Sequence, residues 1–415
     1  MSRAKSLAAQ RTYPTQLSVG EAIAIISGQA SILELETVAL RAALGRTLAH
    51  DLSSRVDHPS SDNSALDGYA CHTTDTTSAT PETPVVLKLI GDVPAGSPFY
   101  GVVGTGEAVS IYTGATLPGG ADAIVGVEFA EVTGDTVSLS RPASTGDVRP
   151  RAQDLQLGEI YLRRGERITA AAVGVAAMMG HAEIPVIRRP RVGILATGDE
   201  IVEPGQPIRE GQVYNSNAYA LAALVERAGG EAVPLPNVRD DIKALEASLN
   251  DLSLDLLLTS GGVSMGRYDF VRDLLFDKGQ VHFWKAAMKP GGPVLFGSYD
   301  GLPVLGLPGN PVSSLVVFEL LGRAFVQQAL GSLEPLPYFT RLPAIAATSF
   351  KHAGFKETFA RTTLLIGNDG RYRAGSTGNQ SSGVLRSLLL ADGLAVIPPH
   401  TDVTEGDRLE VIPLS

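Results

Sequence analysis

The sequence predicts a multidomain protein with a central doubly wound α/β domain, an inserted β domain, a C-terminal β-barrel and a helical or mixed N-terminal domain. The chain of 415 residues is too long for one ordinary hydrophobic core, so several domains are expected. Between residues 190 and 330, uniformly apolar runs alternate with amphipathic segments, which is typical of a parallel sheet covered by helices on both faces. Short β-branched runs separated by Gly and Pro turns precede and follow that region, as in small β domains.

Helices are expected in the N-terminal region. A capping-box spacing opens a helix at residues 18–26, and a second helix is expected over 38–44, ended by Gly45 in a left-handed conformation. A third helix, capped by a threonine, is expected over 169–180 and is similar in character to the first. We therefore expect the β region between them to be inserted into a discontinuous N-terminal domain.

The central and C-terminal regions give a clear succession of elements. Strands are expected at 191–196, 254–259, 293–296 and 303–306, and helices at 217–228, 241–249 and 312–330. Strands predominate again at 341–346, 358–366, 393–398 and 408–413, which predicts a compact β-barrel or sandwich. The expected domains are residues 1–57 with 156–188 (N-terminal), 58–155 (inserted β), 189–331 (α/β) and 332–415 (barrel).

Composition excludes several classes of function. The formal net charge of −10, with no run of lysine or arginine, disfavours a nucleic-acid partner. No apolar run is long enough to cross a membrane, and the N-terminus lacks the apolar core of a secretory signal. Cys71 is the single cysteine, so an intramolecular disulfide is excluded. A cytoplasmic protein without a membrane partner is expected.

Familiar catalytic and metal-binding patterns are also absent from the sequence. The seven histidines lack the spacing of zinc ligands, and one cysteine cannot support a zinc or iron–sulfur centre. The chain has neither a P-loop nor a dinucleotide-binding fingerprint.

Candidate site residues follow predicted strands of the α/β region, where ligands bind in such sheets. Glu200, in a TGDE motif after the first strand, would point into the crevice, although an ordinary turn explains the motif equally well. In the TSGGVSMG motif after a later strand, Gly261 and Gly262 would let backbone N–H groups close on an anion. Ser260 and Ser264 would add hydroxyl donors.

Two further motifs bring positive charge and a helix start to this region. Lys285 and Lys289 flank a segment beside the only tryptophan, Trp284, between predicted strands, which favours an oxyanion ligand. Asn310 and Pro311 fit a helix N-cap and first turn; a structural role is sufficient, but a helix N-terminus also binds anions. Together these residues predict Mg²⁺-assisted phosphoryl or nucleotidyl chemistry on a polyanionic small molecule.

Seven motifs, in this order, resemble the family of bacterial molybdopterin molybdenumtransferases (MoeA) and the gephyrin C-terminal domain. They are DNSALDGYA (62–70), VPAG (93–96), TGA (113–115), TGDE (197–200), SGGVS (260–264), WKAAMKPG (284–291) and LPGNPVS (307–313). The resemblance extends over about residues 18 to 400, which is nearly the whole chain.

The resemblance implies an α/β domain of the molybdopterin-binding type and an elongated homodimer. The active cleft would lie between the β domain of one subunit and the α/β domain of the other. The implied reaction inserts molybdenum from molybdate into adenylylated molybdopterin, with Mg²⁺-dependent release of AMP, and gives the molybdenum cofactor. The molybdopterin adenylyltransferase and the cofactor-accepting enzymes are candidate protein partners.

The resemblance also assigns residues to roles. The implied catalytic acids are Asp67, Glu200, Asp240 and Asp269, of which Glu200 and Asp269 are the candidate Mg²⁺ ligands. The implied substrate contacts are Thr113, Asp154, Lys285, Lys289, Pro308, Pro311, Arg361 and Ser382, to which the motifs themselves add Gly261, Gly262, Ser264 and Asn310. Asp269 is expected at a solvent-facing position. Gly292 stands where many relatives have a lysine, which removes one positive charge from the anion side.

Two other functions compete with this one. The molybdopterin adenylyltransferase carries the α/β domain alone, so the inserted β domain and the barrel favour the later, metal-inserting step. A scaffold that anchors receptors, as gephyrin does, would not need to keep Asp67, Glu200 and Asp269 beside the lysines.

Overall fold

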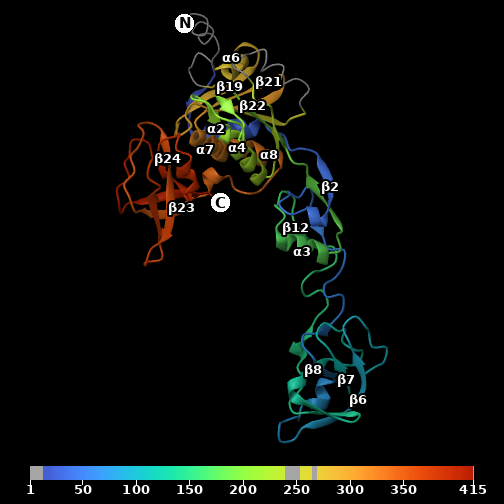
Figure 1. The fold of residues 1–415 in the computed structure, drawn as a ribbon. Coiled ribbons are helices and arrows are strands. Elements are labelled where there is room, and N and C mark those ends of the chain that lie inside the picture. The colour runs from blue at the N-terminus through green and yellow to red at the C-terminus, as the bar shows by residue number, and fades with distance from the viewer. Residues whose placement is uncertain (1–12, 239–252, 264–268, 415) are drawn as a thin grey trace, which may run out of the picture.

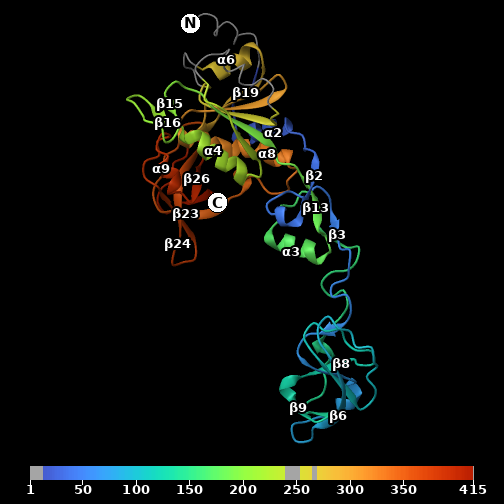
Figure 2. The same cartoon turned by 45° about the vertical axis from the view of Figure 1, so that its right-hand side comes forward.

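The computed structural model describes residues 13–238, 253–263 and 269–414. The molecule is elongated (Figure 1): an α/β domain and a C-terminal barrel occupy one end, and a small β domain occupies the other. Two chain segments form a narrow neck between the β domain and the rest of the protein, and both views show it (Figure 2). The predicted fold class is confirmed.

The first elements pack on the α/β domain. Strand β1 (Thr15–Leu17) pairs in parallel with β19 (Gln280–Ala286) at the edge of the large sheet. Helix α2 (Val19–Gly28) begins with the predicted capping box, in which Ser18 and Glu21 exchange hydrogen bonds. The buried face of α2 joins the core of the α/β domain, so these elements pack there and not with the mixed domain to which the sequence-based boundary gave them.

The mixed domain lies between the α/β domain and the neck. It contains β2 (Leu35–Ala39), β3 (Leu52–Ser53), β12 (Ile160–Leu162), α3 (Ala170–Met178) and β13 (Glu183–Ile187). The helix predicted over 38–44 is wrong in its first half, because this segment pairs antiparallel with β13 and only Leu40–Ala42 forms a 3-10 turn. Gly45 does adopt the predicted left-handed conformation, with φ of 74°.

The β domain at the far end is a six-stranded sheet in the order β8-β5-β7-β6-β10-β9. These strands are β5 (Gly68–Cys71), β6 (Val85–Val93), β7 (Glu107–Ile111), β8 (Ala123–Gly126), β9 (Ala130–Thr133) and β10 (Thr136–Leu139). Short β4 (Asn63–Ser64) and β11 (Val148–Arg149) pair where the chain enters and leaves the domain.

The α/β domain is built on a seven-stranded sheet in the order β1-β19-β21-β22-β18-β14-β17. The strands not yet given are β14 (Arg191–Ala196), β17 (Glu231–Pro234), β18 (Leu256–Ser260), β21 (Leu295–Tyr299) and β22 (Leu302–Leu307). The prediction of a parallel sheet is correct for β22, β18, β14 and β17 but wrong for β21. Only two residues join β21 to β22, which is too short for the crossover that a parallel pair needs.

Helices cover both faces of this sheet. On one face lie α4 (Ser216–Arg227), α7 (Pro311–Val317) and α8 (Arg323–Ala329), together with α2. The other face carries α6 (Phe270–Asp277). The single helix predicted over 312–330 is interrupted by a π-helical turn at Phe318–Gly322, and the helix predicted over 241–249 lies outside the described residues.

The C-terminal domain is a closed barrel in the order β20-β24-β25-β23-β27-β26, with β24 also paired to β26. Its strands are β20 (Met288–Lys289), β23 (Leu342–Ala346), β24 (Glu357–Ile366), β25 (Tyr372–Ser376), β26 (Gly393–Ile397) and β27 (Arg408–Pro413). Strand β20 belongs by sequence to the α/β domain, so it joins the two domains. No helix among the described residues is long and apolar enough to cross a membrane.

Candidate active site

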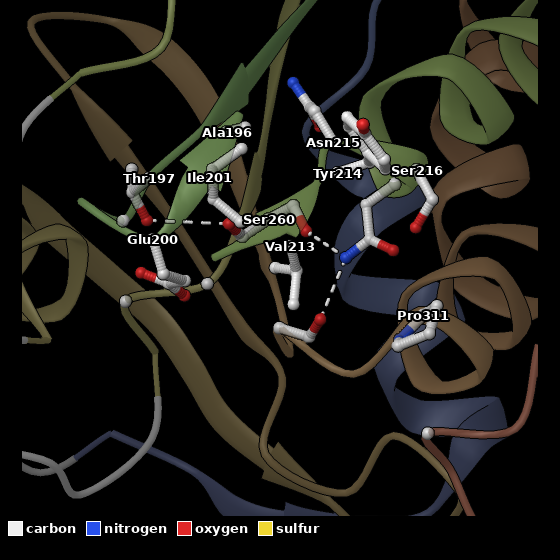
Figure 3. Close-up of a pocket in the computed structure, with 16 residues that line it drawn as sticks. Ala196, Thr197, Glu200, Ile201, Val213, Tyr214, Asn215, Ser216, Ser260 and Pro311 are labelled. Carbon is white, nitrogen blue, oxygen red and sulfur yellow. Dashed lines mark hydrogen bonds between the residues drawn. The ribbon is translucent and has the colours of Figure 1, made fainter. Parts of the chain in front are cut away.

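A cavity of about 550 Å³ opens at the carboxyl ends of β14 and β18, where the sequence predicted a ligand crevice (Figure 3). Three loops and the start of α4 form its walls. The residues that line the cavity include Thr197, Glu200, Asn217, Ser260, Gly261, Gly262, Gly309, Pro311 and Gly383. Of the predicted site residues, the structure thus brings Glu200, Gly261, Gly262 and Pro311 together.

Glu200 enters the cavity wall through a turn that requires a glycine. Gly198 has φ of 138°, and a Cβ on it would lie 2.5 Å from a carboxylate oxygen of Glu200. The carbonyl of Gly198 accepts a hydrogen bond of 3.2 Å from Asn237, which anchors the turn. The turn therefore explains the glycine of the TGDE motif and leaves the carboxylate beside the cavity.

Of the two glycines after β18, Gly261 uses its N–H within the fold. Gly261 and Gly262 have φ of 103° and 73°, a region that favours glycine. The N–H of Gly261 donates to the carbonyl of Leu307 at 3.0 Å, so it does not face an anion. A Cβ on Gly261 would lie 3.0 Å from Oγ1 of Thr197, which shows that this glycine allows a close approach of two loops. Ser264 lies outside the described residues.

Sequence reasoning missed the residue that joins these loops. Asn217, at the start of α4, donates through Nδ2 to Oγ of Ser260 at 2.7 Å and to the carbonyl of Gly309 at 2.9 Å. The preceding asparagine, Asn215, caps α4 by accepting a hydrogen bond from the N–H of Ala218. An asparagine-rich helix start was the only signal in the sequence.

Lys285 lies inside strand β19, whereas the sequence had indicated a position between strands. Its φ of 74° is unusual for a residue other than glycine and marks a strained position, as is frequent at functional sites. Its ammonium group lies 4.4 Å from the ring centre of Trp284. The indole N–H of Trp284 donates to the carbonyl of Val263 at 3.3 Å, so this pair contacts the glycine loop.

Arg361 is the most unusual charged residue of the region. Its side chain is on β24, only 2% of the residue is exposed, and burial lowers its pKa. It donates to Oγ of Ser387 at 3.1 Å and to the carbonyl of Ser381 at 3.2 Å. Within the described residues no carboxylate pairs with it. It is therefore a buried cation held by neutral groups.

Two predicted site residues, Lys289 and Ser382, are connected to the segments around Arg361. Lys289 is paired with Thr358, on the same strand as Arg361. The carbonyl of Ser382 accepts a hydrogen bond of 3.1 Å from the N–H of Val312, in the first turn of α7, and Gly383 lines the cavity. The segment 381–383 thus connects the buried guanidinium to the cavity wall. Asn310 is the N-cap of α7 by position, without a side-chain cap bond, and Pro311 is the first helical residue.

A lysine that the sequence did not single out lies next to Gly292. A Cβ on Gly292 would be 3.5 Å from Nζ of Lys356. Lys356 thus places an ammonium group next to Gly292, where many relatives have a lysine. Lys356 belongs to the barrel and lies 64 positions after Gly292 in the sequence, which is why no local motif revealed it.

Asp67 and Thr113 meet at a turn of the β domain. The backbone N–H and the hydroxyl of Thr113 donate to the same carboxylate oxygen of Asp67, at 2.7 and 2.8 Å. These two hydrogen bonds hold the pKa of Asp67 below its usual range. The β domain is separated from the α/β domain by the neck (Figures 1 and 2), so this turn and the cavity do not meet within one chain.

The remaining predicted acids are dispersed. Asp154 lies in the neck, where its N–H donates to the carbonyl of His58, and it lines a separate cavity of about 760 Å³. Asp269 was predicted to face solvent, but it is only 8% exposed, because it lies at the N-cap of α6 and pairs with Arg272 of that helix at 3.6 Å. Asp240 lies outside the described residues.

The described residues contain no group of three or more His, Cys, Asp or Glu that could hold a metal ion. Mg²⁺, however, is commonly held by one or two carboxylates, with substrate phosphate and water completing its shell. Glu200 is a cavity carboxylate compatible with that mode, whereas Asp269 is engaged by Arg272.

Comparison with known proteins covers the whole architecture. Residues 17–180 match the MoeA N-terminal region (domains I and II), residues 193–328 a probable molybdopterin-binding domain, and residues 343–414 the MoeA C-terminal region (domain IV). A molybdopterin molybdenumtransferase 2 of Mycobacterium tuberculosis is 39% identical over 90% of this chain and 94% of its own length. The chain belongs to the MoeA family.

Other MoeA-family proteins agree with this assignment. The molybdopterin molybdenumtransferase of Haemophilus influenzae is 33% identical, over 92% of this chain and 94% of its own. The crystal structure of a molybdopterin biosynthesis MoeA protein from Pyrococcus horikosii superposes with a TM-score of 0.80 at 31% identity, covering 96% of this chain and 99% of that one. The resemblance read from the seven motifs is confirmed, and the roles of the individual residues stay predictions.

Proposed function

We propose that this protein is a molybdopterin molybdenumtransferase, which inserts molybdenum from molybdate into adenylylated molybdopterin and releases AMP. Its membership of the MoeA family and its relatives of that name support a transferase of molybdenum-cofactor biosynthesis. The observation that carries the chemistry is Arg361, a buried guanidinium without a carboxylate partner in the described part of the chain, beside the segment that lines the cavity. A buried cation of this kind stabilises an anionic ligand.

The basic residues account for two tasks in the proposed reaction. Molybdate and the substrate phosphates are oxyanions, so Arg361, Lys285 and Lys289 would bind and orient them. Cleavage of the phosphoanhydride to release AMP increases negative charge on the leaving group, and fixed cations stabilise that charge in the transition state. Lys356, next to Gly292, would add to the same positive field.

Mg²⁺ dependence is part of the proposal and follows from the family. When bound, Mg²⁺ would neutralise the charge of the phosphates near Glu200. The fixed contribution of this chain is the Gly198 turn, which holds the Glu200 carboxylate at the cavity wall.

We further propose a homodimer that combines the Asp67–Thr113 turn of one subunit with the cavity of the other. The supporting observation is the separation of these two parts within one chain (Figures 1 and 2). A two-fold dimer would form two such clefts. Asp154 in the neck, Asp269 and Asp240 would then act from the same assembled cleft. Cytoplasmic location, and contact with the adenylyltransferase and with cofactor-accepting enzymes, complete the proposal.

Reconstitution of the reaction tests this function. The purified protein is mixed with adenylylated molybdopterin, molybdate and Mg²⁺, and AMP release and molybdenum bound to the pterin are measured. We expect both products in equal amounts, and neither when molybdate or Mg²⁺ is omitted. Consumption of ATP with free molybdopterin, and no reaction with the adenylylated form, would instead assign the preceding adenylylation step.

A further inference from the structure

The orientation of the Asn217 amide is fixed by its surroundings. Its Nδ2 lies 2.9 Å from the carbonyl of Gly309, and a carbonyl oxygen only accepts hydrogen bonds. Rotation of the amide by 180° would place two acceptors against each other, so the NH₂ group must face Gly309. The same nitrogen lies 2.7 Å from Oγ of Ser260, and its two hydrogens serve these two contacts.

The amide arrangement leaves one polar atom of Asn217 unsatisfied. Its Oδ1 is buried and has no hydrogen-bond partner among the described residues. Buried polar atoms are nearly always paired, and an exception requires an explanation. The two bonds made by Nδ2 therefore determine the position of the side chain, although Oδ1 loses a partner.

The consequence for Ser260 concerns its proton. Since Asn217 donates to Oγ, the hydroxyl of Ser260 acts as the acceptor in that contact and its own proton is directed elsewhere. Ser260 is only 6% exposed, and the described residues offer its hydroxyl no acceptor. Ser260 also lines the cavity of Figure 3, so the cavity is the place where this proton can be donated.

We infer that Ser260 donates a hydrogen bond to an anionic oxygen of the ligand and that Asn217 is the positioning residue that directs this donor. The cavity contact comes from Ser260, and Asn217 acts through it. The inference rests on the proposed function only for the identity of the ligand, an adenylylated compound whose phosphate supplies the anionic oxygen. Ser260 is thus the hydrogen-bond donor that the SGGVS motif offers to the ligand. The N–H of Gly261 cannot take this role because it donates to Leu307.

A double-mutant cycle separates this role from a merely structural one. Ser260→Ala removes the donor and should weaken AMP binding about tenfold, the value of a hydrogen bond to a charged group. Asn217→Asp replaces the donor by a carboxylate, which accepts a hydrogen bond from the Ser260 hydroxyl and repels the anion; a loss of about 10- to 100-fold is expected. In the Asn217→Asp protein, the additional change Ser260→Ala should then cost less than about twofold, because that proton is already diverted.

The protein contains its own reporter for these titrations. Trp284 is the only tryptophan, and its indole bonds to Val263 in the same loop as Ser260. Its fluorescence is titrated with AMP, with inorganic phosphate and with adenosine. Binding of AMP and phosphate should follow the pattern above, whereas adenosine, which lacks the anionic oxygen, should bind Ser260→Ala as it binds the wild type.

Folding is controlled in two ways. Asn217 is the second residue of α4, where a carboxylate is favourable, but Asn217→Asp also loses the hydrogen bond to Gly309, so its melting temperature is measured beside its affinity. Tyr219→Phe removes a hydrogen bond of 3.0 Å to Glu203 from the same helix but away from the cavity, and AMP should bind it normally. If Asn217→Asp fails to fold, the cycle is repeated with Asn217→Ser.

The outcomes are distinct. Independent, multiplicative losses in the cycle, equal loss for adenosine, or unchanged affinity of Ser260→Ala for AMP would overturn the inference. Absence of AMP and phosphate binding to the wild type would also overturn it. If the cycle behaves as expected but the wild type does not release AMP from adenylylated molybdopterin, the inference stands and the proposed function fails.

Discussion

The cavity of the α/β domain and the Asp67–Thr113 turn of the β domain are built in opposite ways. Behind one wall of the cavity, next to the segment 381–383, Arg361 is buried and held only by neutral groups. At the turn, one oxygen of the exposed Asp67 carboxylate accepts two hydrogen bonds from Thr113, which lower the pKa of this carboxyl. One part can bind anions, and the other supplies a fixed negative charge. In the proposed homodimer these two parts are complementary half-sites of one cleft.

The largest effect is expected from removing the cation of the first half-site. Arg361→Met keeps most of the side-chain volume and should weaken molybdate or AMP binding about 100-fold, the upper value for a charge-assisted contact. Because the guanidinium lacks a carboxylate partner in the described residues, its removal should leave the melting temperature unchanged or raise it. The measurement pairs ligand titration with thermal unfolding.

Arg371→Met is the matched control, since this arginine is on the same barrel with its side chain 63% exposed. It should change neither quantity. A steep fall in the melting temperature of Arg361→Met with normal affinity would make Arg361 a structural residue and contradict its role in the anion-binding half-site.

The second half-site contains its own control. Asp122 is held by the N–H and hydroxyl of Thr73 at 2.6 and 2.7 Å, the same arrangement as at Asp67, and the pKa of both carboxyls is lowered for the same reason. Asp67→Asn should reduce the rate of AMP release about 10- to 100-fold and leave AMP affinity unchanged, since the contacts to AMP are assigned to the cavity side of the cleft. Asp122→Asn should leave both unchanged.

The two aspartates also make a joint pH prediction. A carboxyl whose folded-state pKa is depressed contributes stability above its unfolded-state pKa, and that stability is lost as pH falls through the folded-state value. Both asparagine variants should therefore be less sensitive to acid below about pH 4, the unfolded-state range of aspartate. Equal loss of AMP release in both variants would show that Asp67 supports the domain and does not act in the reaction.

A smaller effect is expected at Lys356. Lys356→Gln should weaken molybdate binding about threefold to tenfold, because a partly exposed charge is screened by water. Lys351→Gln is the control: this lysine is on the same barrel, its side chain is 83% exposed, and it pairs with Asp402 at 2.8 Å. Equal affinities of the two variants for molybdate would show that Lys356 has no role in anion binding.

The last prediction concerns whether the β domain and the α/β domain unfold independently of each other. Cys71 is buried in the β domain, where burial raises the pKa of its thiol to about 12, and Trp284 is in the α/β domain. In increasing urea, we expect Cys71 to react with a thiol reagent before the fluorescence of Trp284 changes, since the smaller domain has the smaller core. Coincident transitions would show that the neck transmits stability between the regions.

Much of the fold could be predicted because local signals and tertiary packing agree. The strands Arg191–Ala196 and Arg408–Pro413 and the capping box of α2 are as expected, since apolar runs and a short-range cap determine them. The segment 38–44 was mispredicted because pairing with β13, far along the chain, overrides its helical propensity. Lys285 was placed between strands because a charged residue interrupts the apolar pattern of β19.

The same distinction applies to the site. Glu200 and Gly261 could be found because each belongs to a short motif at a strand end. Asn217 could not, because its partner Gly309 is 92 positions away, and Lys356 approaches Gly292 from another domain. The burial of Arg361 and Asp269 likewise depends on packing that no local pattern encodes.

The central claim is that one cleft combines half-sites from two subunits. Inactive Asp67→Asn protein is mixed with inactive Arg361→Met protein, subunit exchange is verified by mass spectrometry, and AMP release is measured. Random exchange makes half of the dimers mixed, and each mixed dimer has one intact cleft, so about a quarter of the wild-type activity should return. No recovery in verified mixed dimers would contradict a shared cleft and would indicate that Asp67 and Arg361 act within the same subunit.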